Sequence, residues 1–271
     1  MERKKITIPD LLNFKKQNRK ITMLTAYDFP MSVALEKAAI DIILVGDSLG
    51  NVILGYESTV PVTMDEMLHH TKAVSRGRKK SLLVADMPFM SFNVTSRKTI
   101  INAGKFIKEA GADAVKLEGA NPDIVSIIKS VVSSGIPVMG HLGLTPQTAT
   151  ALGGYKVQGK DEESAEIIMR QALALEKAGC FSIVFECIPE TLASDITIKL
   201  KIPTIGIGAG KGCDGQVLVT HDLLGLGVGF TPKFVKKYTD LSSQIDSAIE
   251  NFREEVIMEK FPAPEHCFKI K

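Results

Sequence analysis

Short apolar runs rich in β-branched residues alternate along the chain with longer stretches whose apolar residues recur at helical spacing. This alternation predicts parallel strands joined by helices, and eight repeats over about 250 residues are typical of a (β/α)8 TIM barrel. A doubly wound open sheet is the main alternative, because strand number alone does not exclude it. We therefore predict an α/β fold with strands at 21–26, 42–45, 82–85, 114–117, 137–140, 182–185, 204–207 and, with the weakest pattern, 233–238.

Helix boundaries carry recognisable capping residues. Asn121 followed by Pro122 predicts the start of one helix, and Thr63 with Glu66 has the spacing of a capping box at the start of another. Residues 8–18 predict an extra N-terminal helix that closes the N-terminal end of the barrel, and residues 240–260 predict the last helix. No low-complexity linker divides the chain, so we predict one domain over residues 1–271.

Polar residues end five consecutive predicted strands. They are Asp47, Asp86, Glu118, His141 and Glu186. Because the carboxyl ends of the strands form one ring in a parallel barrel, we expect these side chains to share a site. An acidic residue after a strand can also serve only as the N-cap of the next helix, a role open to Asp47 and Asp86. Five polar residues in succession favour the shared site.

The residue types at these strand ends indicate their chemistry. Asp47, Asp86 and Glu118 would bring three carboxylates together, and their repulsion calls for a cation. Oxygen ligands alone favour Mg²⁺ over zinc. Lys116, on the same strand face as Glu118, would offset the remaining charge and receive an anionic substrate. Glu186 stands apart from the trio and is the predicted proton acceptor.

Composition narrows the function class. The chain has 33 Lys and Arg against 31 Asp and Glu, a net charge of +2, which argues against nucleic-acid binding. No apolar run is long enough to span a bilayer, and the basic N-terminal segment lacks the apolar core of a secretory signal. The four cysteines form no paired motif, so we expect buried structural thiols and a cytoplasmic protein.

Two motifs suggest rival activities. Residues 46–50 match the G-x-S-x-G turn of serine hydrolases and contain the GDSL string of one esterase group. That esterase group also needs a D-x-x-H motif late in the chain, which is missing here, and a hydrolase leaves Asp86, Glu118 and Glu186 without a role. Residues 210–215 fit G-x-G-x-x-G, but no first βαβ unit surrounds them, so we expect a loop after the seventh strand.

The chain resembles the ketopantoate hydroxymethyltransferase family along nearly its whole length. The matching strings include VGDSLG at 45–50, ADMPF at 85–89, KLEGA at 116–120, GHLGLTPQ at 140–147 and GGYKVQGK at 153–160. TAYD at 25–28, the segment 55–77, FEC with Pro189 at 185–189 and the segment 206–222 extend the match. So many ordered strings leave coincidence negligible.

This resemblance implies a (β/α)8 barrel that uses Mg²⁺ and 5,10-methylenetetrahydrofolate. It implies transfer of a hydroxymethyl group to 3-methyl-2-oxobutanoate, giving 2-dehydropantoate for pantothenate and coenzyme A synthesis. The family typically forms large homo-oligomers, often decamers. Carried over by position, the metal ligands are Asp47, Asp86 and Glu118, some of them through water; the oxo-acid contacts are Asp47, Ser48, Asp86 and Lys116; and the proton acceptor is Glu186.

Three further points stay open at this stage. His141 is expected near the substrate or the waters of the metal, as an auxiliary group. Another Mg²⁺-dependent oxo-acid enzyme of the same barrel type, such as a C–C lyase or a phosphoenolpyruvate mutase relative, is the alternative function. A catalytically silent barrel that acts as a binding or assembly subunit is disfavoured, because all the proposed polar residues are present.

Overall fold

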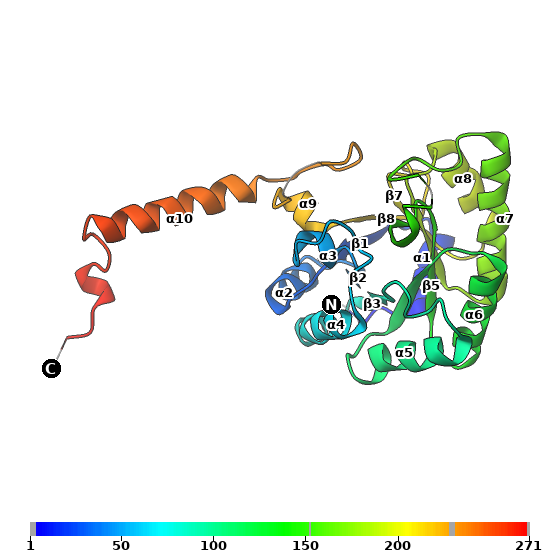
Figure 1. The fold of residues 1–271 in the computed structure, drawn as a ribbon, viewed down its shortest axis with the longest axis horizontal. Coiled ribbons are helices and arrows are strands. Elements are labelled where there is room, and N and C mark those ends of the chain that lie inside the picture. The colour runs from blue at the N-terminus through cyan, green and yellow to red at the C-terminus, as the bar shows by residue number, and fades with distance from the viewer. Residues whose placement is uncertain (1–3, 152, 228–230, 270–271) are drawn as a thin grey trace. The chain divides into compact units, whose positions relative to one another are not determined.

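Eight parallel strands close into a barrel in the order of the chain, in a computed structural model that describes residues 4–151, 153–227 and 231–269 (Figure 1). Every neighbouring pair is parallel, including β8 with β1. This confirms the predicted (β/α)8 architecture over the open sheet. The strands are β1 Ile21–Thr25, β2 Ile42–Val45, β3 Leu82–Asp86, β4 Ala114–Glu118, β5 Val138–Gly143, β6 Ser182–Glu186, β7 Thr204–Ile207 and β8 Gly215–Leu218.

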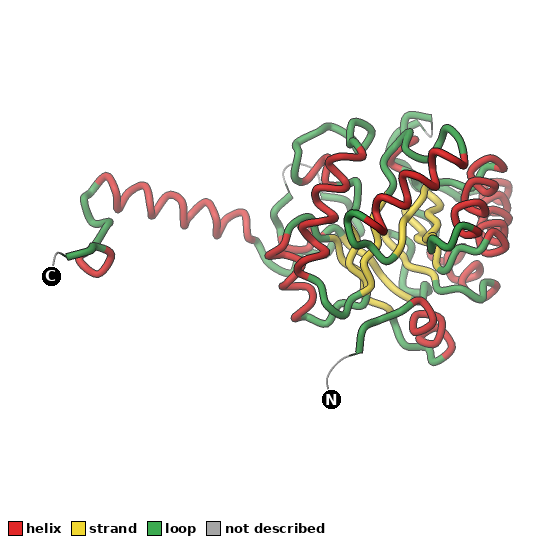
Figure 2. The backbone as a smooth tube through the Cα atoms, turned by 90° about the horizontal axis from the view of Figure 1, so that it is seen from below, coloured by secondary structure: helices red, strands yellow, loops and turns green. Residues whose placement is uncertain are grey.

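Helices surround the barrel strands (Figure 2). The predicted caps are present: Thr63 and Glu66 form a capping box, and the Asn121 side chain accepts the backbone N–H of Ile124. Residues 1–220 form one compact unit that holds all eight strands. Its helices are α1 Ile8–Lys16, α2 Phe29–Lys37, α3 Leu49–Val52, α4 Met64–Gly77, α5 Ser96–Lys108, α6 Pro122–Ser133, α7 Glu162–Ala178 and α8 Glu190–Lys199, with a 3-10 turn at Pro146–Thr148.

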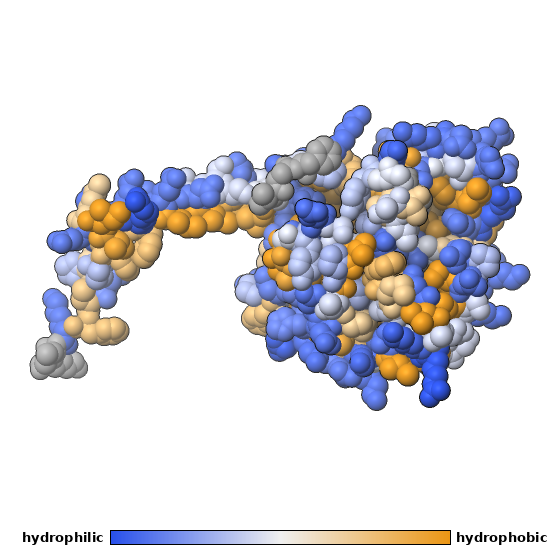
Figure 3. Space-filling model, in the orientation of Figure 1, coloured by the Kyte–Doolittle hydropathy of each residue, from blue (hydrophilic) through white to orange (hydrophobic). Residues whose placement is uncertain are grey.

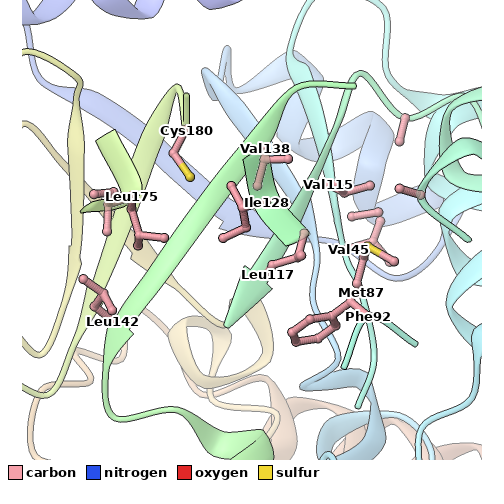
Figure 4. Close-up of a cluster of buried hydrophobic side chains, with 14 of the residues drawn as sticks. Val45, Met87, Phe92, Val115, Leu117, Ile128, Val138, Leu142, Leu175 and Cys180 are labelled. Atoms are coloured by element: carbon pink, nitrogen blue, oxygen red, sulfur yellow. The ribbon is translucent and has the colours of Figure 1, made fainter. Parts of the chain in front are cut away.

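Strand alternation divides the core into two layers. Val115 and Leu117 of β4 pack outward against the helices, in a cluster that includes Ile128 of α6 (Figure 4). Lys116 and Glu118, on the opposite face of the same strand, point into the barrel and are buried. The packing of the outer layer therefore fixes which polar groups face the interior.

The N-terminal helix closes one end of the barrel, as predicted. Leu11 of α1 is fully buried in the inner cluster, together with Ile21 and Met23 of β1. Lys15 Nζ lies 2.7 Å from Asp214 Oδ2 and anchors the helix to the segment just before β8. The opposite, C-terminal end of the barrel is left for the polar strand ends.

The prediction of the eighth strand was wrong. Residues 233–238 form turns and a bend, whereas the barrel is closed by Gly215–Leu218, which pairs with both β1 and β7. The connection from β7, residues 208–214, contains no helix, so the expected alternation fails at this point. The glycine-rich motif at 210–215 is a loop, as expected, but its last residue already belongs to β8.

Gly215 is needed where the barrel closes. A Cβ atom added there would lie 2.5 Å from the carbonyl oxygen of Ile21 and 2.6 Å from Cδ1 of Ile205. We expect Gly215→Ala to lower the free energy of unfolding by about 1–3 kcal/mol, because backbone must move to admit the methyl group. Gly104→Ala in α5 is the control: nothing lies within 4 Å of its added Cβ, and a gain of about 0.5–1 kcal/mol is expected. Urea unfolding of both variants measures the difference, and equal stabilities would contradict this account.

Residues 221–271 form the second compact unit. Most of α9 (Thr220–Leu224) lies in it, together with α10 (Leu241–Ile257) and a 3-10 turn at Pro264–His266. The predicted last helix is thus confirmed, with Asp240 as its N-cap. An apolar row runs along α10 (Figure 3), formed by the exposed side chains of Ile245, Ile249, Phe252 and Val256. The single-domain description of residues 1–271 stays a prediction.

The structure shows which cysteines are buried and whether a helix could cross a membrane. Cys180 and Cys213 are buried as expected, but Cys187 is partly exposed and Cys267 is exposed, so the expectation of four buried thiols was wrong. Cys267 belongs to the second unit, whose α10 buries no side chain. Within the described ranges, every helix is too short or too polar to cross a bilayer.

Candidate active site

The residues predicted from the strand ends do meet at the C-terminal end of the barrel. Asp86 and Glu186 are the last residues of β3 and β6, Glu118 is the last residue of β4, and Asp47 lies two residues beyond β2. The ladder places Glu118 beside His141. Four of these five positions belong to strands rather than to the loops after them, and none serves as a helix N-cap.

Lys116 lies at the centre of this cluster. Its Nζ lies 3.0 Å from Asp86 Oδ1 and 3.1 Å from His141 Nδ1, and the side chains of all three are at most 5% exposed. The other oxygen of Asp86, Oδ2, accepts the backbone N–H of Asp47 at 3.2 Å. The ammonium group is thus held between a carboxylate and an imidazole, inside the barrel.

The protonation of His141 follows from its two partners. Nε2 lies 2.8 Å from the carbonyl oxygen of Leu144, which can only accept, so Nε2 carries the proton. Nδ1 faces the Lys116 ammonium, which can only donate, so Nδ1 accepts. Burial, followed by the charge of Lys116, lowers the pKa of His141 well below its usual value and keeps the ring neutral. Nε2 also lies 3.4 Å from Glu186 Oε2, which links the imidazole to the predicted base.

Burial raises the pKa of each carboxyl group, and repulsion by neighbouring carboxylates adds to this at Asp47, Glu118 and Glu186. Desolvation and the charge of Asp86 raise the pKa of Asp47 to about 7, and desolvation raises that of Glu186 to about 8. The pKa of Glu118 is raised well above its usual value by burial and then by Asp47. Burial alone would lower the pKa of Lys116, but the charges of Asp86 and Glu118 outweigh it and raise that pKa. The site therefore has more carboxyl groups than cationic groups, and a bound cation would stabilise their ionised forms.

The carboxyl and amide oxygens of the site offer a partial set of ligands for a divalent ion. In the described part of the chain, Asp86 Oδ1 has no hydrogen-bond partner beyond its ion pair with Lys116, and Gln147 Oε1 is buried with none. Among the residues that the structure describes, no three His, Cys, Asp or Glu side chains converge as a complete metal cage. Mg²⁺ usually takes one or two carboxylates and completes its octahedron with water and substrate oxygens. Asp47, Asp86 and Glu118 could supply one or two such carboxylates, and the others could act through water.

Ser48 has a partner that argues against a serine hydrolase. Its Oγ lies 2.8 Å from the hydroxyl of Tyr27, a residue that is only 1% exposed. A phenol beside the serine is not the imidazole base that such a nucleophile needs. Ser48 is the N-cap residue of α3, but its side chain makes no capping hydrogen bond and contacts the hydroxyl of Tyr27 instead.

Sequence reasoning did not assign two residues of the site, Tyr27 and Gln147. Gln147 donates from Nε2 to Asp47 Oδ2 at 2.8 Å and from its backbone N–H to Glu118 Oε2 at 3.2 Å. Both residues lie in strings that match the family pattern, TAYD and GHLGLTPQ. Tyr27 lies two residues beyond β1, as Asp47 does beyond β2, but the prediction selected carboxylate and imidazole side chains and passed over a phenol. Gln147 lies in the turn after β5, where the strand-end rule gives no signal.

The raised pKa values predict how the stability of the metal-free protein depends on pH. A carboxyl whose folded pKa lies above its unfolded pKa binds more protons in the folded state, so its stabilisation is present at low pH and lost as pH rises. For Asp47 and Glu186 that loss runs from about pH 4 to about pH 8. We expect the free energy of unfolding, measured with urea, to fall by at least about 1 kcal/mol between pH 5 and pH 8.

Asp47→Asn should flatten this pH slope, and added Mg²⁺ should do the same in the native protein. Asp161→Asn is the matched control, because Asp161 is an exposed N-cap whose pKa is lowered by its hydrogen bonds with Ser164. The control should keep the native slope. A slope that Asp47→Asn leaves unchanged would contradict the raised pKa of Asp47.

Comparison with known proteins gives one consistent family. The family model described as ketopantoate hydroxymethyltransferase matches residues 5–264. The 3-methyl-2-oxobutanoate hydroxymethyltransferase of Moorella thermoacetica is 55% identical over 268 residues, which cover 99% of each chain. The enzyme of the same name from Carboxydothermus hydrogenoformans is 54% identical over 98% of this chain and 96% of its own.

Solved structures that resemble the fold are more distant in sequence. Phosphoenolpyruvate phosphomutase from Streptomyces platensis subsp. rosaceus superposes with a TM-score of 0.63 at 14% identity, covering 96% of this chain and 92% of its own. A 2,3-dimethylmalate lyase of the PEP mutase/isocitrate lyase superfamily gives 0.62 at 12% identity, covering 95% and 90%. At these identities the likeness concerns the barrel fold alone.

Proposed function

Because the chain belongs to the ketopantoate hydroxymethyltransferase family, we propose that it transfers a hydroxymethyl group from 5,10-methylenetetrahydrofolate to 3-methyl-2-oxobutanoate. The product would be 2-dehydropantoate, on the route to pantothenate and coenzyme A. One observation carries the proposal: Asp47, Asp86 and Glu118 are buried around Lys116 at the barrel mouth, with Glu186 beside them. That arrangement suits a small anion, a cation and a proton transfer.

Mg²⁺ is the proposed metal, held by Asp47, Asp86 and Glu118, directly or through water. When bound, it would supply positive charge that stabilises the negative charge developing on the substrate oxygens. The buried carboxyl groups support this proposal: burial raises the pKa of all three, repulsion adds to this at Asp47 and Glu118, and a cation would offset both effects.

The chain's own residues would bind and deprotonate the oxo acid. Lys116 would pair with the substrate carboxylate, with Asp47, Ser48 and Asp86 as further contacts. Glu186 would take the proton from C3, the carbon next to the keto carbon. The electron pair of the broken C–H bond would then form the new bond from C3 to the folate-derived carbon. Water would supply the hydroxyl oxygen of the product and release tetrahydrofolate.

His141 would act as an auxiliary group in this reaction. Its neutral ring accepts from Lys116 and carries an N–H 3.4 Å from Glu186 Oε2. This contact would orient the base without competing for the substrate proton, because the Nε2 position is already protonated.

Turnover of purified full-length protein tests the proposal. We expect 2-dehydropantoate only when 3-methyl-2-oxobutanoate, 5,10-methylenetetrahydrofolate and Mg²⁺ are all present.

A second candidate, a Mg²⁺-dependent oxo-acid lyase or mutase, is supported by the shared barrel fold. Product formation without folate, or cleavage of a C–C bond in the oxo acid, would favour that candidate and overturn the first.

The proposal extends to the setting of the enzyme. We expect small-molecule substrates rather than nucleic acid, a cytoplasmic location, and a homo-oligomer, decameric as is typical of the family. The exposed apolar row on α10, Ile245, Ile249, Phe252 and Val256, supports an assembly, because such rows are usually covered.

A further inference from the structure

Gln147 holds its side-chain amide in a defined orientation. Nε2 lies 2.8 Å from Asp47 Oδ2 and 3.0 Å from the carbonyl oxygen of Met87. The carbonyl can only accept, so the NH₂ group faces Asp47 and Met87 and the amide oxygen Oε1 points elsewhere. The orientation of an amide is often ambiguous, but here its two neighbours decide it.

The backbone of Gln147 binds a second carboxylate, that of Glu118. Its N–H donates to Glu118 Oε2 at 3.2 Å. Gln147 lies in the 3-10 turn that follows β5, where Pro146 fixes the first position and the hydroxyls of Thr145 and Thr148 lie 2.6 Å apart. A short, locally braced turn thus connects Asp47 with Glu118 across the mouth of the barrel.

The amide oxygen of Gln147 lacks a donor. The residue is 5% exposed, and among the described residues no group donates to Oε1. A buried acceptor left unpaired costs about 1–3 kcal/mol. Standard amide geometry puts Oε1 ~2.3 Å from Nε2, hence within ~5 Å of Asp47 Oδ2. Lys116, the buried cation of the cluster, is already engaged by Asp86 and His141.

We propose that Gln147 is a positioning residue for the metal site, holding Asp47 through Nε2 and a water molecule of the cation's shell through Oε1. This inference rests on the proposed metal site. A water bound to a cation is a strong donor and a weak acceptor, which matches a carbonyl oxygen that has no other partner. Outer groups of this kind orient the direct ligands and are typically worth 10–100-fold in metal affinity.

The role of Gln147 is tested by measuring Mn²⁺ binding to the purified full chain with calorimetry and electron paramagnetic resonance. Gln147→Met keeps the length and removes both the donor and the acceptor, so Mn²⁺ affinity should fall roughly 10–100-fold. Gln147→Asn keeps the amide but shortens its reach, and should lose affinity to a smaller extent. Gln216→Met is the matched control, because Gln216 is exposed on β8 and donates to the carbonyl of Gly210.

The outcomes separate the two proposals. If the native chain binds no Mn²⁺, the proposed metal site is wrong. If the native chain binds and Gln147→Met binds within twofold of it, the site stands and the role of Gln147 is overturned. Thermal unfolding without metal completes the comparison: a purely structural residue would lower the melting temperature and leave the affinity of the folded protein unchanged. If Gln147→Met does not fold, the Gln147→Asn affinity decides in the same way.

Discussion

Replacing Glu186 by glutamine is expected to slow Mg²⁺-dependent exchange of the C3 proton of 3-methyl-2-oxobutanoate by roughly 10²–10⁴-fold, the usual contribution of a general base. Glutamine keeps the shape of the side chain and an oxygen for the Nε2–H of His141, but cannot take up the proton. Proton NMR in D₂O measures the exchange directly. In the native protein the exchange should proceed without folate, because the proposed reaction removes this proton before the one-carbon unit is transferred.

The environment of Glu186 gives the physical reason for this choice. Its side chain is 17% exposed, against 4% for Glu118 and 5% for Asp86, so it is the carboxylate most open to the barrel mouth. Burial still raises its pKa to about 8, which suits a base acting near neutral pH.

Glu190→Gln is the matched control for the proton exchange. Glu190 begins α8, four residues along the chain, and contacts the backbone N–H of Lys211 outside the site. The Glu190→Gln variant should exchange the C3 proton at the native rate. Native exchange in Glu186→Gln would instead remove Glu186 as the base.

Most of the barrel could be predicted because β2, β3, β4, β5 and β6 are buried on both faces over nearly their whole length. Such strands read as continuous apolar runs, and seven of the eight predicted ranges overlap the observed strands. The eighth, β8, has four residues, starts at Gly215 and follows β7 without a helix. Nothing local marks it as a strand, since its position is set by pairing with β1 and β7. The same non-local closure explains why the weak pattern at 233–238 misled the prediction.

The part of the candidate site that lies at strand ends could be predicted from the sequence. Parallel strands bring their carboxyl ends together, so Asp86, Glu118 and Glu186 were found from their place at strand ends. Gln147 contacts Asp47 across 100 positions of sequence, and its place in a 3-10 turn gives no such signal. The local sequence likewise did not indicate that Tyr27 positions Ser48, because the contact depends on how β1 and β2 pair.

Asp86→Asn is expected to weaken Mg²⁺ or Mn²⁺ binding roughly 100-fold or more, beyond the 10–100-fold typical of outer groups, and to lower turnover at fixed Mg²⁺ accordingly. The substitution keeps the size of the side chain and removes one negative charge from the site. Asp86 is the carboxylate that both pairs with Lys116, at 3.0 Å, and accepts the backbone N–H of Asp47. Without this negative charge, the ammonium group of Lys116 is less fully neutralised and repels a bound cation more strongly.

Asp214→Asn separates loss of a metal ligand from general loss of stability. Asp214 is partly buried and accepts from Lys15 at 2.7 Å and from the backbone N–H of Thr204, so its loss should destabilise the anchor of α1. It holds the N-terminal end of the barrel and should leave ion affinity unchanged. Calorimetric titration of both variants with Mn²⁺, alongside urea unfolding, measures the two effects. Equal loss of affinity in the two variants would show that the ion does not bind at Asp86, because Asp214 contacts Lys15 and Thr204 and lies outside the site.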